Sequence, residues 1–356
     1  MFKKAITTAF MAIMAVTFTA CHKNQPVVLD EQPSDGSIVF GIQPGEGLVT
    51  GEVTTKAIKP ATSVTTFKAE CSTDVHGKTV VWNNRAFTNN GSGTYMASPK
   101  AYWPSTNTGY TFYAVCAAPT DANAAVITSV PDITAASGTN AADGPTIAVP
   151  VNYGRDLICA YLPYDSSSPG TTGTPTAGKA VYKAKNNLEF KHVFARISTV
   201  SVTNADGAAT ISNYTIKLKN VKTGGTYNLK TGNGQTNGTG WSSLLPADGT
   251  NPILLSNAGS LAPGAAASTT GSVYNATDQS LYIVPGTYKL IATWTASVDQ
   301  YTQTYTSKES TASFAFVGGK INAINCRLTG DPAELQFSVS VAEWTNNSVG
   351  PADFNH

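Results

Sequence analysis

The sequence predicts an all-β protein built from β-sandwiches. Segments in which apolar and polar residues alternate recur along the chain and are bounded by turn residues, the pattern of strands that bury one face. Helical periodicity is scarce. Charged residues make up 13% of the chain, about half the usual share, and Thr, Ser, Asn, Ala and Gly take their place. This composition is typical of secreted β-proteins with long loops.

The strand pattern also predicts how the chain is divided. The clearest strand candidates are 36–42, 63–71, 78–82, 110–118, 156–162, 187–203, 211–221, 280–286, 287–298, 304–317 and 334–344. Stretches 102–115 and 282–294 echo one another, since each holds an aromatic residue, a proline, a glycine-bearing turn, a tyrosine and an alternating strand. One echo in each half predicts two similar sandwiches that meet near residues 179–187.

The N-terminus has the features of a lipoprotein signal. MFKK is followed by an apolar run that ends in small residues directly before Cys21. The run is too short for a membrane-spanning helix. We expect residues 1–20 to be removed and Cys21 to carry the acyl chains, including palmitate, that hold the body at a membrane outside the cytoplasm. Ordinary secretion with cleavage near Ala20 is the alternative.

The remaining cysteines allow two interpretations. They are Cys71, Cys116, Cys159 and Cys326. In an oxidising compartment four cysteines could form disulfides with three possible connectivities. Those in the strand candidates 63–71 and 110–118 alternate in phase with apolar neighbours, however, so small buried residues are the favoured interpretation.

Several classes of function have no support in the sequence. The formal net charge is +1 and basic runs are missing, so a nucleic-acid partner is not expected. Metal-ligand and nucleophile motifs are missing too, and we expect no cofactor. GTPTAGKA resembles a phosphate loop, but Ala180 stands where the Mg²⁺-binding hydroxyl belongs. His192 lies within a strand candidate, where a hydrogen-bonded ring is a better interpretation than a catalytic base.

The tryptophans suggest one alternative function, which is the binding of glycans. Trp82, Trp294 and Trp344 lie on or at the end of strand candidates, where core packing is expected. Trp103 and Trp241 lie beside turns and could be exposed for stacking on sugars. The alternative function is therefore an outer-membrane surface lipoprotein that binds glycans.

Together, several segments resemble the fimbrillin family of type V pilins. They are the lipobox ending at Cys21, TTKA, AYWPSTNTGYTFYAV, DLICA, LEFKHVFARISTVSV, FVGGKINAINCRL and the closing VSVAEW. The resemblance runs from residue 21 to 344. It implies two transthyretin-like β-sandwich domains in a lipoprotein delivered to the cell outer membrane and then to a surface fimbrium. It also implies cleavage by a trypsin-like protease before assembly.

Carried onto this sequence, the resemblance assigns the processing residues. Cys21 carries the lipid, and the cut falls between Lys56 and Ala57. Lys59 is a second possible site, although Pro60 after it resists such cleavage. The implied divisions are a propeptide at 21–56 that includes the first strand, an N-terminal sandwich at 57–184 and a C-terminal sandwich at 185–356.

The resemblance also predicts how subunits join. Ile38, Phe40 and Ile42 form one face of a strand whose removal would leave an open slot in the N-terminal sheet, and such an edge recruits another chain. The expected donor is the C-terminal strand of a neighbour, through Leu335, Phe337, Val339 and Val341. If that strand stays in its own domain, the tail 345–356 is the only mobile donor. The expected partners are copies of the chain, related pilin subunits, the protease and the outer membrane, and the role is structural rather than enzymatic.

Overall fold

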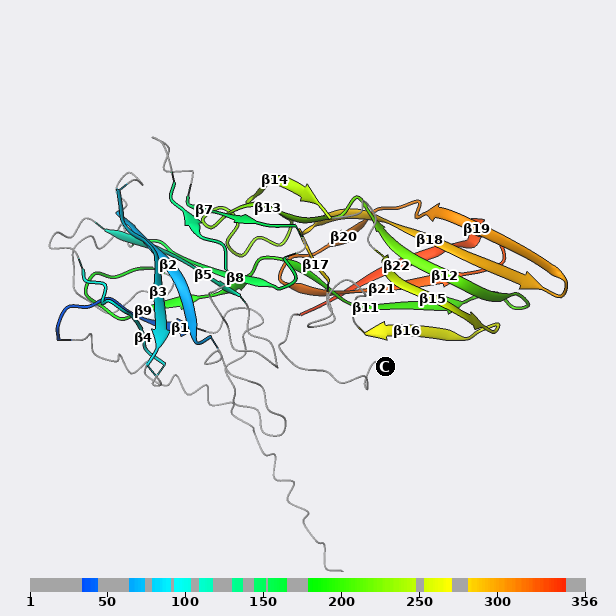
Figure 1. Ribbon diagram of the computed structural model, residues 1–356, viewed down its shortest axis with the longest axis horizontal. Coiled ribbons are helices and arrows are strands. Elements are labelled where there is room, and N and C mark those ends of the chain that lie inside the picture. The colour runs from blue at the N-terminus through cyan, green and yellow to red at the C-terminus, as the bar shows by residue number, and fades with distance from the viewer. Residues whose placement is uncertain are drawn as a thin grey trace, which may run out of the picture. The chain divides into compact units, whose positions relative to one another are not determined.

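The computed structural model shows a chain of β-strands joined by turns and loops (Figure 1). It describes residues 34–43, 64–73, 79–90, 93–103, 109–117, 130–136, 144–151, 153–164, 179–247, 253–270 and 281–343. Helical structure within these ranges is limited to the 3-10 turn η2 (Pro332–Glu334). No helix in the described ranges has the length and hydropathy needed to cross a bilayer. The all-β prediction is confirmed.

Eight strands, all before residue 193, form one sheet. They are β1 (Val39–Gln43), β2 (Thr66–Thr73), β3 (Thr79–Asn89), β4 (Tyr95–Ala97), β5 (Tyr110–Ala117), β8 (Leu157–Leu162), β9 (Asn186–Glu189) and β10 (Lys191–His192). Their order across the sheet is β10-β8-β5-β2-β3-β4-β1-β9. All neighbours run antiparallel except β1 and β9, which run parallel.

This sheet closes on itself. β9 and β10 occupy its two ends, yet only Phe190 separates them along the chain. The segment 186–192 therefore pairs with β1 on one side and with β8 on the other. Phe67, Phe112 and Phe190 lie inside the curled sheet and are fully buried. Closure removes the free edges of the sheet, so β1 has a neighbour on each side.

The strands after residue 194, apart from β13 (Lys222–Asn228) and β14 (Trp241–Pro246), form a β-sandwich. One sheet has the order β16-β11-β21-β22, with β17 also beside β11, and the other has the order β15-β12-β18-β19, with β20 also beside β18. The bounds are β11 (Ala195–Asn204), β12 (Thr210–Lys219), β15 (Ile253–Leu261), β16 (Ala266–Thr270), β17 (Leu281–Ile283), β18 (Gly286–Val298), β19 (Tyr301–Glu309), β20 (Phe314–Phe316), β21 (Lys320–Leu328) and β22 (Gln336–Glu343).

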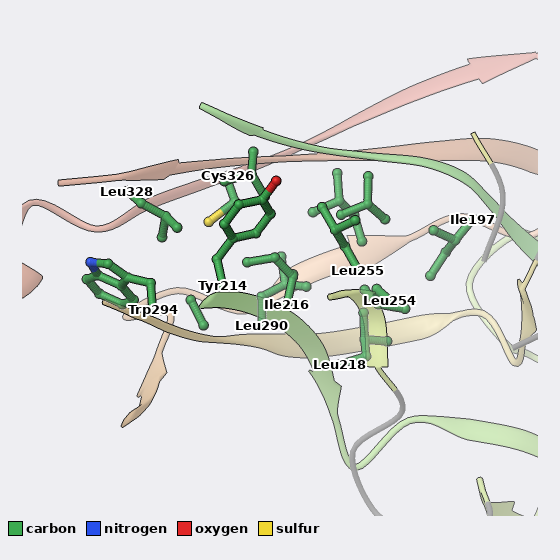
Figure 2. Close-up of a cluster of buried hydrophobic side chains, with 14 of the residues drawn as sticks. Ile197, Tyr214, Ile216, Leu218, Leu254, Leu255, Leu290, Trp294, Cys326 and Leu328 are labelled. Atoms are coloured by element: carbon green, nitrogen blue, oxygen red, sulfur yellow. The ribbon is translucent and has the colours of Figure 1, made fainter. Parts of the chain in front are cut away.

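The two sheets of the sandwich share one apolar core (Figure 2). Tyr214 and Leu290 enter it from one sheet and Cys326 from the other, and all three are buried. Trp294 is also fully buried, and its indole Nε1–H donates to the carbonyl of Thr329 at 2.9 Å. Pairing the one polar atom of the indole lets the ring fill the core without leaving an unsatisfied donor.

A further sheet joins strands from both halves of the chain. Its order is β14 (Trp241–Pro246), β13 (Lys222–Asn228), β7 (Thr146–Val149) and β6 (Ile133–Thr134). β7 precedes the predicted boundary at residue 184 and β13 follows it, yet the two pair, with Ile147 opposite Tyr227. β9 and β10 also follow residue 184 and complete the eight-stranded sheet. The division at 184 and 185 stays a prediction.

The strand predictions succeed where alternation is strong. Candidates 36–42, 63–71, 110–118 and 156–162 correspond to β1, β2, β5 and β8. The long candidate 187–203 is divided into β9, β10 and β11, because the chain leaves one sheet and enters another there. The four cysteines of the described strands are buried and free, as the favoured interpretation predicted.

Candidate functional site

β1 fills a slot between two strands of the closed sheet. On one side it runs antiparallel to β4, with Val39 opposite Met96 and Phe40 opposite Tyr95. On the other side it runs parallel to β9, from Phe40 opposite Asn186 to Gln43 opposite Glu189. Removing β1 would therefore leave the inner edges of β4 and β9 without backbone partners.

The inward face of β1 is embedded in aromatic side chains. The ring centroid of Phe40 lies 4.9 Å from that of Phe87, 5.0 Å from that of Phe112 and 6.0 Å from that of Phe67, all in edge-to-face geometry. Phe40 has no exposed surface. Ile38 is buried beside it, and Ile42 packs partly buried against the same cluster. The three residues predicted as the displaced strand thus share one apolar face.

On the opposite face of β1, side chains of the neighbouring segment lie very close to Gly41. A Cβ atom added to Gly41 would lie 2.1 Å from Asn187 Oδ1 and 3.3 Å from Lys185 Cε. Asn187 is the parallel partner of Gly41 on β9. The contacting atoms are ends of flexible side chains, so a small residue fits here once Asn187 turns away. A long side chain meets Lys185 as well.

The pairing of this segment continues before β1. The amide of Ile38 donates to the carbonyl of Ala101 at 2.7 Å, and Ser37 forms an antiparallel bridge with Tyr102. Asp35 lies 2.5 Å from Lys100 Nζ, and hydrogen bonding by that ammonium lowers the pKa of the Asp35 carboxyl to about 2. The slot is therefore longer than β1 itself.

β22 lies at the edge of its own sheet. It pairs with β21 from Gln336 to Glu343 without a register shift, and the described strands place no partner on its other side. Phe337 and Val339 are half-buried against the sandwich core, as is Leu335 just before the strand. Val341 is 48% exposed. The predicted donor residues thus form an apolar face whose last member contacts little.

β22 differs from the other long edge strands described here. Ser243 in β14 and Ser307 in β19 have positive φ angles, and register shifts interrupt the pairing of β14, β15 and β19 with their neighbours. Such irregularities make an edge a poor template for another strand. β22 has neither feature, and its one charged residue, Glu343, is paired with Lys320 at 2.6 Å. Among the described edge strands of six or more residues, it is the one best shaped for strand pairing.

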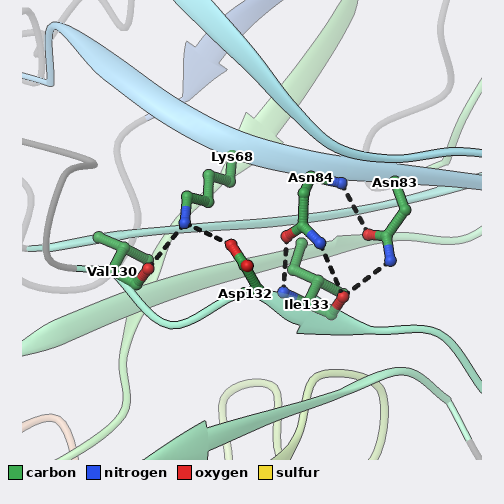
Figure 3. Close-up of polar contacts among 6 residues, drawn as sticks. All are labelled: Lys68, Asn83, Asn84, Val130, Asp132 and Ile133. Carbon is green, nitrogen blue, oxygen red and sulfur yellow. Dashed lines mark hydrogen bonds and ion pairs between the residues drawn. The ribbon is translucent and has the colours of Figure 1, made fainter.

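A clamp that the strand patterns did not predict holds β6 against the eight-stranded sheet (Figure 3). The amide of Ile133 donates to Asn84 Oδ1 at 2.6 Å, and its carbonyl accepts from Asn84 at 3.0 Å and from Asn83 at 2.7 Å. Lys68 Nζ donates to the carbonyl of Val130 at 2.8 Å and contacts Asp132 at 2.6 Å. The Asn83-Asn84 pair directly after the strand candidate 78–82 was the available signal, since asparagine tolerates the left-handed backbone seen at Asn84.

His192 forms a buried hydrogen-bonded contact with Asp156. Its Nδ1 contacts Asp156, and each side chain is 1% exposed. Burial raises the pKa of the Asp156 carboxyl, although the imidazole next to it acts in the opposite direction. A group this buried cannot meet a dissolved substrate, so the structural interpretation of His192 is favoured. In the described stretches no three His, Cys, Asp or Glu side chains are grouped as metal ligands.

The two turn-side tryptophans are packed rather than free. Trp103 is 8% exposed, and its ring lies 5.7 Å from Tyr110 and from Phe112, so the expectation of an exposed indole was wrong there. Trp241 is half-buried, 5.1 Å from Tyr227. Trp82 and Trp294 pack in cores as expected. Trp103 therefore has no exposed ring face on which a sugar could stack.

The predicted processing residues lie outside the described part of the chain. Cys21, Lys56 and Ala57 all fall outside the described ranges. The same is true of Trp344, one of the tryptophans predicted to pack in a core. The place of the cut along the chain is still informative. Residues 44–63 connect β1 to the buried Val64 just before β2, and Lys56 lies in that connection. A cut there would separate β1 covalently from every other strand described.

Part of the chain matches a known protein family. Residues 174–344 match the family of fimbrillin-like proteins. The chain is fimbrillin-like in its C-terminal half. The resemblance to the fimbrillin family predicted from the sequence is thereby confirmed.

Solved structures resemble this chain over most of its length. A fimbrial protein from Bacteroides vulgatus is 16% identical and has a TM-score of 0.52, with 86% of this chain and 99% of that one covered. The tip fimbrial protein Mfa3 from Porphyromonas gingivalis, with a C-terminal truncation, is 12% identical with a TM-score of 0.31, over 86% and 99%. The first likeness shows the fold, and the second is too distant to carry an argument. No curated protein matches the chain.

Proposed function

We propose that the chain is a structural subunit of surface fimbriae that polymerises by β-strand exchange and supports adhesion. It is delivered to the cell outer membrane as a lipoprotein acylated on Cys21, and a trypsin-like protease cuts it between Lys56 and Ala57. The observation that carries the proposal is the position of β1. This strand completes a closed sheet, yet it joins the rest of the body only through the stretch that contains Lys56.

The cut prepares an acceptor. While β1 is covalently attached, it occupies the slot at high effective concentration, and no separate chain competes with it. After the cut a second chain can displace it, because an empty slot would expose the aromatic cluster around Phe40 and two unpaired strand edges. Burying such apolar side chains again is worth roughly 1.5–3 kcal/mol each before ordering costs.

The donor is β22 of another copy or of a related pilin subunit. Among the described strands β22 is bound by one neighbour, and it keeps its apolar face half-buried. In the slot it gains a second neighbour and fuller burial of Leu335, Phe337 and Val339. Slot and donor lie on different surfaces of one chain, so the contact is heterologous, and heterologous contacts that do not close on themselves generate filaments.

Trypsin treatment of the purified chain without its lipid tests the proposal. We expect a trimmed body that begins at Ala57 and forms ladders resistant to SDS. Lys56→Gln is the matched control and should stay monomeric under the same limited digestion. A body trimmed at Ala57 that stays monomeric at high concentration would show that the chain is no self-polymerising subunit.

A further inference from the structure

Two segments far apart in the sequence have the same side-chain pattern. Residues 38–42 read IVFGI and residues 335–339 read LQFSV. Each has an aliphatic residue, then a central phenylalanine two positions later, then a small residue and a second aliphatic residue. The first segment occupies the slot, and the second leads into and forms the start of β22.

We propose that the C-terminal strand enters the slot of a second copy in one direction and one register. Leu335 takes the place of Ile38, Phe337 that of Phe40 and Val339 that of Ile42, and the strand runs in the direction of β1. This inference rests on the proposed function, because it specifies how the exchange occurs and not whether it does.

The aromatic cluster selects the register. The space of Phe40 is bounded by Phe87, Phe112 and Phe67, each within 6.0 Å by ring centroid. Only Phe337 in the donor has a side chain of that size and shape. A shift of two residues places Val339 there and leaves a cavity, while forcing Phe337 into the smaller space of Ile38. Cavities and overpacking both weaken a closely packed contact.

The close approach at Gly41 selects the direction. With the strand running as β1 does, Ser338 stands at the Gly41 position, 2.1 Å from Asn187 Oδ1 by its Cβ until that side chain turns. With the strand reversed about Phe337, Gln336 stands there instead. The longer glutamine side chain would also meet Lys185, whose Cε lies 3.3 Å from the same Cβ position. The direction of β1 is therefore preferred.

This arrangement leaves one mismatch, which is useful as a test. Gln336 takes the place of Val39, which is 1% exposed in the slot. An amide side chain at a buried position weakens the contact unless it is hydrogen-bonded. Val341, by contrast, lies beyond the position of Ile42 and contributes to none of the three spaces.

Disulfide trapping between copies tests the register directly. Val39 is opposite Met96 in the described structure, so Gln336 of the donor should be opposite Met96 of the acceptor. After cleavage, chains with Gln336→Cys and Met96→Cys should form ladders that survive SDS and heat without reductant. Ser338→Cys with Met96→Cys is the matched control for a shift of two residues and should not be trapped.

The outcomes separate this inference from the proposed function. The register would be overturned if the control pair, Ser338→Cys with Met96→Cys, were trapped in place of the first pair. It would also be overturned if polymers formed in normal yield and neither pair were trapped. Failure of the unmodified cleaved chain to polymerise would instead remove the proposed function. In a chain without the cysteine substitutions, Gln336→Val should raise the temperature at which polymers dissociate in SDS. A lower dissociation temperature would contradict the placement of Gln336.

Polymerisation rates give a second, independent readout. Phe337→Ala should slow polymerisation by about tenfold or more, because it leaves the Phe40 space empty. Val341→Ala should leave the rate within about twofold, since a surface change away from the contact has little effect. Equal slowing by both variants would place Val341 in the slot and overturn the register.

Discussion

β1 and β22 are alternating strands of similar sequence in opposite situations. β1 has a partner on each side, and Phe40 is fully buried among three phenylalanine rings. β22 has one partner among the described strands, and Phe337 is half-buried, with its ring centroid 6.5 Å from that of Phe314. One pattern is thus compatible with a central strand and with an edge strand, and the sequence alone does not distinguish them.

The difference gives strand exchange a direction. Emptying the slot would expose a large apolar surface and two unpaired edges, whereas lifting β22 from its sheet would expose much less. A strand that moves from an edge into a slot gains burial and hydrogen bonds. Exchange in that direction is therefore favourable once β1 is free to leave.

The largest expected effect is at the centre of the slot. Phe40→Ala should lower the free energy of unfolding of the uncut chain by about 3–5 kcal/mol, since a buried aromatic ring is replaced by a cavity. Chemical denaturation measures it. Tyr301→Ala, at a side chain 84% exposed, is the control and should change stability by less than about 0.5 kcal/mol. A similar small loss for Phe40→Ala would mean that β1 is not integral to the core.

The same change at the edge should matter less. Phe337→Ala in the uncut chain should cost roughly 1–2 kcal/mol, because only part of this ring is removed from water. Chemical denaturation of both variants, Phe337→Ala and Phe40→Ala, gives the ratio of their losses in unfolding free energy. If Phe337→Ala is the more damaging substitution, β22 is too firmly held to serve as a donor.

The clamp on β6 should have a local effect. Asn84→Gly keeps the left-handed backbone and removes two side-chain hydrogen bonds to Ile133, at about 1 kcal/mol each. The amide of Ile133 should then exchange its hydrogen faster. Asn213→Gly, at an exposed asparagine with φ of 48°, is the matched control. Unchanged exchange at Ile133 would show that pairing with β7 alone holds β6.

The smallest effect concerns pH. Glu70 of β2 is buried and accepts a hydrogen bond from Ser72, and burial raises the pKa of its carboxyl. A folded state that holds the proton more tightly than the unfolded chain loses stability as pH rises from about 4.3 through the raised pKa. Glu70→Gln should flatten this slope, and denaturation across pH 4–8 measures it. An unchanged slope would assign the titration to other groups.

The sequence predicted the parts of the fold that alternation determines. Strands around Phe67 and Phe112 were evident because their apolar residues recur at every second position. Strands such as β7 and β14 were missed, since both are short and β7 pairs with β13, far along the chain. Ile38, Phe40 and Ile42 were identified, but the closure of the sheet around them depends on the bend at Phe190, which no local pattern reports.

The exposure of tryptophan was equally hard to predict. Trp103 lies beside a turn, and turn residues are commonly exposed, yet the rings of Tyr110 and Phe112 cover it. Tyr182, from a distant part of the chain, also packs against it, with ring centroids 5.4 Å apart. Local sequence therefore gives the direction of a side chain on its strand, while burial is decided by strands that arrive from elsewhere.

The most direct test of the central claim is the rate at which the cut N-terminal segment leaves the body, measured as a function of protein concentration. If the slot is too costly to leave empty, the segment departs as a second copy enters, and release should accelerate with concentration as polymers form. Release at one rate over a hundredfold range of concentration, with or without polymers, would contradict the account.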